Sequence, residues 1–385
     1  MVKEIYLDNA ATTKIDEKVL KEMLPYLKNK YGNASSIYDK GVEAMKVVDD
    51  SRKIVADSIN AASEEIIFTS GGTESNNFAL KGIVMANPEK KHIITTKIEH
   101  PSILNTCEFL KSMEIKIDYL TVNEEGLINI NELKSLINKN TLLVSIIHGN
   151  NEIGTIQDIQ EIGKICRDRG VYLHVDACQS FMKIKIDVKK MNIDLMTLNA
   201  HKIHGPKGVG VLFIRKGIKI IPLFHGGGQE KNIRGGTENV AGIVGFAKAV
   251  SLYNNKDIEK MKRLRDEAIK ELLNIPKTYL NGPVGDKRLS NNINIRFDGI
   301  EGESILGLLN EKGIYVSTGS ACSSKNLKPS HVLLAIGLKP ENAHGSIRIS
   351  LSKYTTDNEI KELIKNMYLI VKKLRNMSPF WENEK

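Results

Sequence analysis

Lys202 is the residue whose surroundings in the sequence most favour chemistry. It lies between two short apolar runs, 193–198 and 209–214, and a Gly-Pro turn follows it. Lysine side chains are normally exposed, and burial lowers the pKa of their ammonium group. A lysine with a lowered pKa can act as a Schiff-base nucleophile or carry protons. The same segment, taken alone, also fits an ordinary lysine in a surface turn.

Polar side chains follow the other predicted strands at the points where those strands end. The apolar runs 65–70, 92–96, 142–147 and 171–175 are short enough for buried strands, and most precede a helical pattern. This alternation predicts an α/β fold with a mainly parallel sheet wrapped by helices, which binds ligands beyond the carboxyl ends of its strands. The residues at these ends are candidates for one site: Gly72, Thr73, His100, Asn151, Asp176, Gln179, His201 and Lys202.

These residues combine an amine, a carboxylate and a turn that can bind an anion. The run Gly71-Gly72-Thr73 leads into a helix, whose free N–H groups attract anions. Pyridoxal phosphate requires a lysine for its Schiff base, a carboxylate at its pyridinium nitrogen and a seat for its phosphate. Lys202 and Asp176 would meet the first two needs. Thr73 and His201 would hold the phosphate, and His100 would lie against the ring. Alone, Asp176 also fits a helix N-cap and His100 a loop histidine.

Cys322 is a second candidate for chemistry, because it lies in the small-residue loop 319–324. An accessible thiolate beside a pyridoxal site can act as a nucleophile, although the local sequence also fits an ordinary loop cysteine. Cys107 and Cys166 lie on helical patterns and are predicted core residues, and Cys178 is predicted to point away from the site. The cysteines have no metal-ligand spacing, which indicates no metal site and a reducing cytoplasm.

The elements that must position these residues divide into two predicted domains. Residues 13–250 form the large cofactor-binding domain, with the repeated strand–helix pattern. Residues 1–12 together with 251–385 form a smaller α+β domain that carries the cysteine loop. Within it, 257–273, 302–309 and 358–374 have helical patterns.

Composition excludes several classes of protein. With 385 residues, 41% hydrophobic and 26% charged, the chain resembles an ordinary globular enzyme. No apolar run approaches the length of a membrane span, and the N-terminus lacks a signal-peptide core. The net charge is +9, and the basic residues are interleaved with acidic residues along the chain. This mixture indicates solvated helix faces rather than a nucleic-acid surface.

Motifs along nearly the whole chain identify a family. They are Tyr6-Leu-Asp-Asn-Ala-Ala-Thr-Thr13, Thr69-Ser-Gly-Gly-Thr-Glu-Ser-Asn-Asn77, Glu99-His100, Asn150-Asn-Glu-Ile-Gly154, Asp176-x-x-Gln179, His201-Lys-Ile-His-Gly-Pro-Lys-Gly208, Gly226-Gly-Gly-Gln-Glu230, Arg234-Gly-Gly-Thr-Glu-Asn239, Gly319-Ser-Ala-Cys322 and Ser346-Ile-Arg-Ile-Ser350. Taken together they resemble the cysteine desulfurases of the NifS/IscS type, within the class V aminotransferase-like enzymes of fold type I. The Gly-Ser-Ala-Cys run is similar to the group with the longer cysteine loop.

The resemblance implies a role for each site residue. Lys202 forms the Schiff base and moves protons, and Asp176 pairs with the ring nitrogen. Gln179 contacts the ring oxygen, while His100 stacks on the ring and acts as acid or base. The phosphate is held by Thr73 and His201, by Asn199 where serine is usual, and by Thr237 from the other subunit of a homodimer. Arg348 and Asn151 hold the substrate carboxylate, and Cys322 attacks the substrate sulfur.

The implied reaction converts L-cysteine to L-alanine and leaves sulfur on Cys322 as a persulfide. The sulfur would supply an iron-sulfur scaffold or another acceptor protein. The chain departs from the family at Ala34, where proline is usual, and at Tyr38, where histidine is usual. The tail after Trp381 is short for docking a scaffold.

Two other readings remain open from the sequence. One is a selenocysteine lyase or another class V β-lyase, which a comparison of substrates would separate. The other is a non-catalytic sulfur-relay or RNA-binding protein on the same fold. The presence of Lys202, Asp176 and Cys322 argues against the second reading, which would predict a colourless protein.

Overall fold

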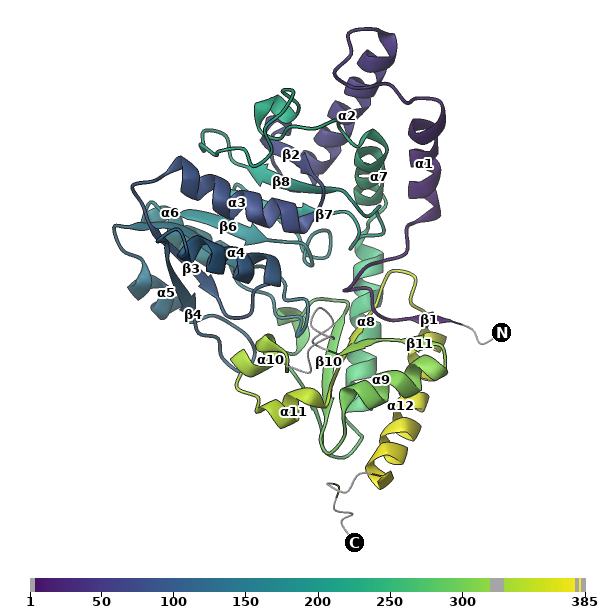
Figure 1. Ribbon diagram of the computed structural model, residues 1–385. Helices are drawn as coiled ribbons and strands as arrows, with labels where there is room; N and C mark the ends of the chain where they lie inside the picture. The colour runs from purple at the N-terminus through teal and green to yellow at the C-terminus, as the bar shows by residue number, and fades with distance from the viewer. Residues whose placement is uncertain (1–3, 319–328, 378–380, 382–385) are drawn as a thin grey trace.

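A computed structural model describes residues 4–318, 329–377 and 381 (Figure 1), so the predicted nucleophile Cys322 lies outside the described residues. The strands of the larger sheet form where the apolar runs predict them. They are β2 (Ile66–Thr69), β3 (His92–Thr96), β4 (Lys116–Leu120), β5 (Thr141–Ile147), β6 (Tyr172–Asp176), β7 (Leu195–Asn199) and β8 (Gly210–Ile214).

The larger sheet has seven strands in the order β2-β8-β7-β6-β5-β3-β4. Strands β3 to β7 run parallel to one another, and β8 runs antiparallel to both β7 and β2. The predicted mainly parallel α/β sheet is confirmed. Strands such as β5 and β7 are buried on both faces, which explains why they read as continuous apolar runs.

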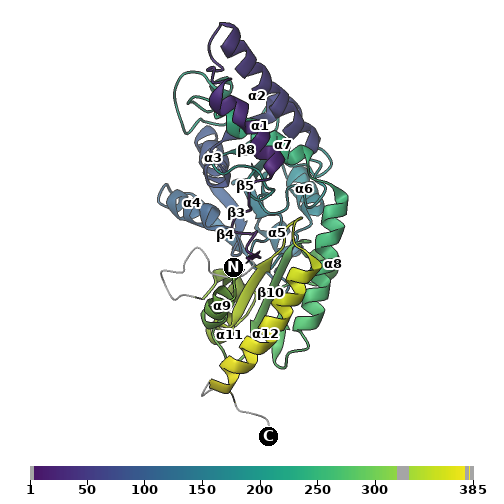
Figure 2. The ribbon, with the colours of Figure 1, turned by 90° about the vertical axis from the view of Figure 1, so that its right-hand side faces the viewer.

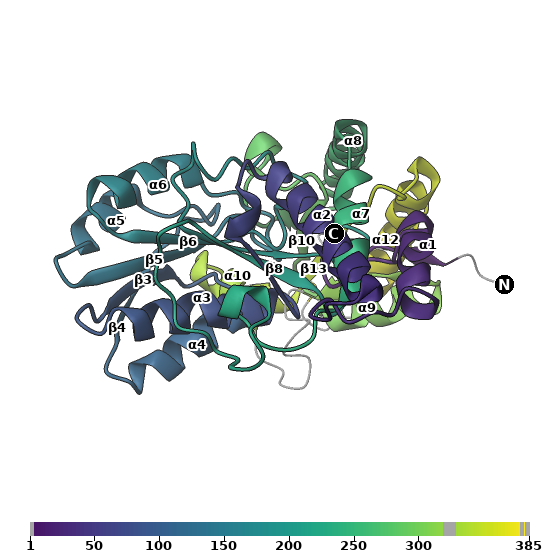
Figure 3. The ribbon, with the colours of Figure 1, turned by 90° about the horizontal axis from the view of Figure 1, so that it is seen from above.

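Helices cover both faces of this sheet, as Figure 3 shows from above. Ile67 of β2 packs with helices α3 and α4, while its neighbours Ile66 and Phe68 pack with α2, α6 and α7 on the opposite face. This alternation follows from the two-residue period of a strand. The helices of this part are α1 (Glu17–Lys28), α2 (Asp39–Ser58), α3 (Gly72–Ala86), α4 (Pro101–Lys111), α5 (Ile130–Leu136), α6 (Ile159–Asp168) and α7 (Val240–Ser251).

A second core surrounds a four-stranded antiparallel sheet of order β12-β13-β10-β9. Helices α8 and α12 lie side by side against it (Figure 2). The strands are β9 (Thr278–Leu280), β10 (Asn292–Phe297), β12 (Ser317–Thr318) and β13 (Ser346–Ser350); the helices are α8 (Asn255–Leu272), α9 (Gly302–Glu311), α10 (His331–Ala335), α11 (Pro340–His344) and α12 (Asp357–Met377).

The N-terminal segment joins the two parts of the molecule. Strand β1 (Ile5–Tyr6) pairs in parallel with β11 (Ile314–Tyr315), and Ile5 and Leu7 are buried in the second core. The chain then crosses to the larger sheet (Figure 1), where the Thr13 N–H donates to the carbonyl oxygen of His201. No helix among the described ranges combines the length and apolar character that a membrane crossing needs.

Candidate active site

A cavity of about 320 Å³ lies beyond the carboxyl ends of the parallel strands. The strand ends converge there because neighbouring parallel strands finish at the same edge of a sheet. Arg348 reaches the same cavity from β13 of the second sheet. The sequence-predicted residues that line it are Gly72, Thr73, His100, Asn151, Asp176, Gln179, Asn199, His201, Lys202 and Arg348.

Lys202 lies in the turn after β7 and is half-buried at the cavity wall. Its Nζ donates to the carbonyl oxygen of Ala10 and, at 2.6 Å, to that of Ala11. The surface-turn alternative is therefore wrong, because this amine faces a cavity and two carbonyl groups. The buried Lys183 lies nearby, and its Nζ donates to the carbonyl oxygens of Gln179 at 3.0 Å and of Lys202 at 3.4 Å. Burial, with Lys202 nearby, lowers the pKa of Lys183 to about 7.

Asp176 ends β6 and is buried, with 3% of its surface exposed. Its Oδ2 accepts a hydrogen bond from the Asn76 amide at 2.8 Å, and its Oδ1 accepts from the backbone N–H of Cys178 at 3.0 Å. The residues after Asp176 form turns rather than a helix, so Asp176 is not a helix N-cap. A buried carboxylate with these two donors is suited to face a cationic ring nitrogen.

His100 forms the N-cap of α4, and its Nδ1 accepts from the Ser102 N–H at 3.1 Å. Because Nδ1 accepts, the neutral ring carries its proton on Nε2. Burial lowers the pKa of His100, against an opposing effect of Asp176. The ring is therefore a neutral donor at the cavity wall, and capping does not exclude a second role there.

The start of α3 is shaped as a seat for an anion. Gly71 has φ of 152°, and a Cβ added to Gly72 would lie 2.7 Å from the Cys178 sulfur, so glycine is needed for this close approach. Thr73 lines the cavity beside them, and the Asn199 Oδ1 is buried without a hydrogen-bond partner among the described residues. These residues, with Lys202 and Asp176, fit pyridoxal phosphate.

His201 lines the same cavity. Its Nδ1 is 3.1 Å from the hydroxyl oxygen of Thr12. Burial, followed by the charge of Lys202, lowers the pKa of His201 to about 4. The imidazole is therefore neutral at physiological pH and offers a polar contact without a fixed charge.

The prediction that Cys178 points away from the site is wrong. Cys178 lines the cavity, and its sulfur lies against Gly72. Burial, reinforced by the charge of Asp176, raises the pKa of its thiol well above the ordinary value, so it is not a thiolate at neutral pH. Cys107 and Cys166 are buried core residues, as predicted.

Thr237 does not line the Lys202 cavity. It borders a separate pocket of about 120 Å³, together with Arg234 and Glu238. Ala34 and Tyr38, the two loop departures, lie beside the start of α2, where Ala34 is buried and Tyr38 exposed.

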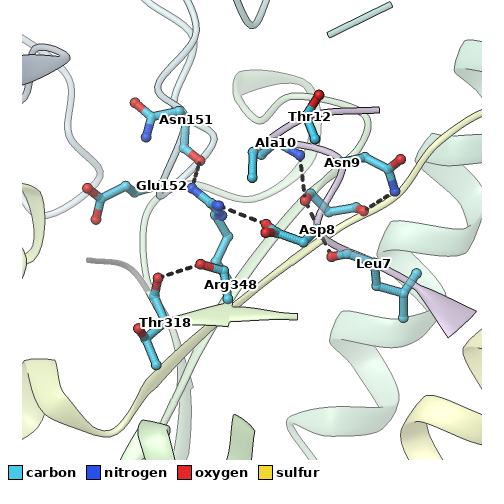
Figure 4. A network of polar contacts seen from close by, with 12 residues as sticks. Leu7, Asp8, Asn9, Ala10, Thr12, Asn151, Glu152, Thr318 and Arg348 are labelled. Atoms are coloured by element: carbon cyan, nitrogen blue, oxygen red, sulfur yellow. Dashed lines mark hydrogen bonds and ion pairs between the residues drawn. The ribbon is translucent and has the colours of Figure 1, made fainter. Parts of the chain in front are cut away.

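Sequence reasoning missed the N-terminal segment as part of the site. The carbonyl of Ala10 also accepts from the side-chain amide of Gln179 at 2.8 Å. Asp8 accepts from Arg348 Nη2 at 2.8 Å (Figure 4). The motif that contains Asp8 and Ala10 is recognisable in the sequence. The alternation of strands and helices does not indicate, however, that this motif lies against Gln179 and Arg348.

Comparison with known proteins places this architecture in a family. The model of the aminotransferase class-V family matches residues 5–363. A curated cysteine desulfurase IscS from Methanosarcina thermophila is 50% identical, over 99% of this chain and 95% of the relative. A solved NifS-like protein superposes with a TM-score of 0.91 at 38% identity, covering 97% of this chain and 100% of its own.

A second solved structure, SspA in complex with cysteine, has a TM-score of 0.83 and is 37% identical, over 92% of this chain and 100% of its own. The whole-chain matches agree with the cavity geometry and with the motifs in the sequence. The chain belongs to the cysteine desulfurases of the NifS/IscS type, within the pyridoxal-phosphate-dependent aminotransferase class-V family.

Proposed function

We propose that this protein converts L-cysteine to L-alanine and transfers the sulfur to Cys322. The observation that carries the proposal is the cavity that brings Lys202, Asp176 and Arg348 together beside a glycine-rich anion seat. An amine, a buried carboxylate and a guanidinium are the groups that pyridoxal chemistry on an amino acid requires. The names of relatives matched over the whole chain support the same activity.

Each cavity residue has a proposed role toward the cofactor. Pyridoxal phosphate, when bound, supplies an electron sink for the electrons released at the substrate Cα. Lys202 would hold the cofactor through Nζ in the resting enzyme, and Nζ would move the Cα proton once the substrate amine has taken its place. Asp176 would pair with the ring nitrogen, Gln179 would contact the ring oxygen, and His100, which holds a proton at Nε2, would cover the ring. Other groups would hold the phosphate: Gly72, Thr73, Asn199, His201 and, from the partner subunit, Thr237.

The substrate carboxylate is proposed to bind Arg348 and Asn151. Arg348 Nη1 already donates to the Asn151 carbonyl oxygen at 3.2 Å, so the two residues are held together. The Cys322 thiolate would attack the substrate sulfur. The carbon–sulfur bond then breaks, a sulfur–sulfur bond forms on Cys322, and alanine leaves after Cβ gains a proton.

We further propose a cytoplasmic homodimer with two shared sites. The chain is proposed to form two domains, residues 13–250 and residues 1–12 together with 251–385. This division is supported by the second core, which combines Ile5 and Leu7 with residues from 261 onward. An iron-sulfur scaffold or another acceptor protein would take the persulfide sulfur, as the role of the family suggests.

Covalent labelling tests the role of Lys202. The purified protein is expected to be yellow, and borohydride should fix the cofactor to Lys202, as found by peptide mass mapping. Lys202→Ala should lose turnover and keep its far-ultraviolet circular dichroism. Lys183 is the internal comparison, since it is a buried lysine of lowered pKa in the same region. Label on Lys183 instead of Lys202 would refute the assignment.

A further inference from the structure

The proposed carboxylate receptor Arg348 already has a carboxylate beside it. Its side chain is 4% exposed, and Nη2 lies 2.8 Å from Asp8 Oδ1 (Figure 4). Nη1 donates to the Asn151 carbonyl oxygen, whereas Nε is buried without a partner among the described residues. The guanidinium is therefore neutralised on one side, with donor capacity left for another acceptor.

The position of Arg348 is fixed by its strand. β13 is an inner strand of the antiparallel sheet, and Arg348 pairs with Ser317 of β12 on one side and with Asn294 of β10 on the other. Its backbone therefore cannot retreat from Asp8 without breaking the sheet.

The position of Asp8 is fixed as firmly, through Ser350 at the end of the same strand. The Ser350 N–H donates to the Leu7 carbonyl oxygen at 2.7 Å, and the Ala10 N–H donates to the Ser350 hydroxyl oxygen at 2.8 Å. The Asn9 side-chain amide donates to the Ser350 carbonyl oxygen at 2.8 Å. Contacts on both sides of Asp8 therefore hold its carboxylate at Arg348, and the pair belongs to the fold rather than to a chance rotamer.

We propose that Asp8 weakens the hold of Arg348 on the substrate carboxylate and so sets the affinity of the site. A ligand carboxylate that binds Arg348 must share the guanidinium with the Asp8 carboxylate, and two negative charges on one guanidinium repel each other. Asp8 thus weakens binding of the α-carboxylate in both cysteine and alanine. Weaker binding of alanine frees the site for the next substrate. Tighter binding of substrate and transition state alike would not raise kcat, so the weaker hold on cysteine does not slow the chemical step. This inference rests on the proposed role of Arg348.

Asp8→Asn isolates the charge, because an amide oxygen still accepts from Arg348 Nη2. The variant is expected to bind L-alanine roughly tenfold more tightly, given partial screening by solvent at Asp8. Binding would be followed through the cofactor absorbance of the holoenzyme. Isothermal titration of 3-mercaptopropionate, which has a carboxylate but no amine, should show the same change. Cysteamine has the amine and thiol without the carboxylate, so its affinity should not change.

Asp16→Asn is the matched control variant. Asp16 belongs to the same N-terminal segment but pairs with Lys353 at 2.8 Å instead of Arg348. It should leave the alanine affinity unchanged. Asp8→Ser provides a second neutral acceptor, should Asp8→Asn fold poorly, and should also bind alanine more tightly.

The outcomes separate this inference from the function on which it rests. Unchanged or weaker alanine binding in the Asp8 variants, with binding lost in Arg348→Gln, would overturn the role of Asp8 alone. Equal tightening of cysteamine would overturn it too, since the effect would not act through the carboxylate. If Arg348→Gln bound alanine like the wild type, Arg348 would not be the carboxylate receptor and the proposed function would need revision.

Discussion

Gly72 lines the cavity at a point where there is no room for an added methyl group. A Cβ there would lie 2.7 Å from the Cys178 sulfur and 3.5 Å from the Asn199 side-chain nitrogen. Gly72→Ala is therefore expected to weaken pyridoxal phosphate binding about tenfold, because overpacking costs about 1–3 kcal/mol. Equilibrium dialysis of the reconstituted apoprotein would measure the affinity.

Cys178→Ala removes the atom that an alanine at position 72 would meet. The double variant Gly72→Ala, Cys178→Ala should recover most of the lost affinity if the contact is steric. If the double variant bound the cofactor as poorly as the single one, the loss would come from the turn itself rather than from Cys178.

At the residue scale, the sequence predicted the chemistry better than the orientation of side chains. Asp176 and Lys202 were predicted from their places at strand ends, and both line the cavity. The orientation of Cys178 was wrong because two-residue alternation stops where β6 ends at Asp176, and the following turn redirects the side chain. Asp8 was missed because its partner lies far away in the sequence.

At the scale of elements, the connection from β3 to α4 places a buried carboxyl next to His100. Glu99 Oε1 accepts from the Thr96 hydroxyl at 2.7 Å and from the Ile147 N–H at 2.9 Å. Burial raises the pKa of Glu99 to about 8. The folded state therefore binds a proton that the unfolded state releases above about pH 4.3.

This difference predicts how stability depends on pH. The contribution of Glu99 to the free energy of unfolding is fully present below the pKa of the unfolded state. It is lost as the pH rises to about 8, at a rate of up to about 1.4 kcal/mol per pH unit. Glu99→Gln, which keeps an acceptor, should gain stability relative to the wild type over this range and then level off. Chemical denaturation at several pH values would measure the difference. Glu124→Gln, at an exposed position, is the control. If the stability difference between Glu99→Gln and the wild type were as independent of pH as that of the control, the pKa of Glu99 would not be raised.

Long apolar strands were easier to predict than short or polar ones. Runs such as 92–96 and 142–147 coincide with β3 and β5 to within a residue, because strands buried on both faces have a distinct composition. The strands β4 and β12 were not predicted. β4 is only partly buried, and β12 has two residues, so neither has a clear apolar run.

At the scale of the whole molecule, the proposed dimer makes each site depend on two chains. Thr237 borders a pocket other than the Lys202 cavity, which is consistent with a role toward a partner. Subunits that carry Lys202→Ala can be co-expressed with subunits that carry Thr237→Ala. A mixed dimer would contain one site with both residues intact if Thr237 acts across the interface, so cofactor retention and turnover should recover partly. No recovery in isolated mixed dimers would contradict the shared site.

The proposed function depends on the transfer of sulfur to Cys322, and a single turnover of the enzyme can follow that step. The holoenzyme would be mixed with L-cysteine, quenched with an alkylating agent and mapped by mass spectrometry, while alanine is counted in the same sample. The predicted result is one added sulfur on Cys322 for each alanine formed, and neither sulfur transfer nor appreciable alanine in Cys322→Ser. Added sulfur on Cys178, which lines the cavity, or transfer at the wild-type rate in Cys322→Ser, would show that Cys322 is not the sulfur acceptor.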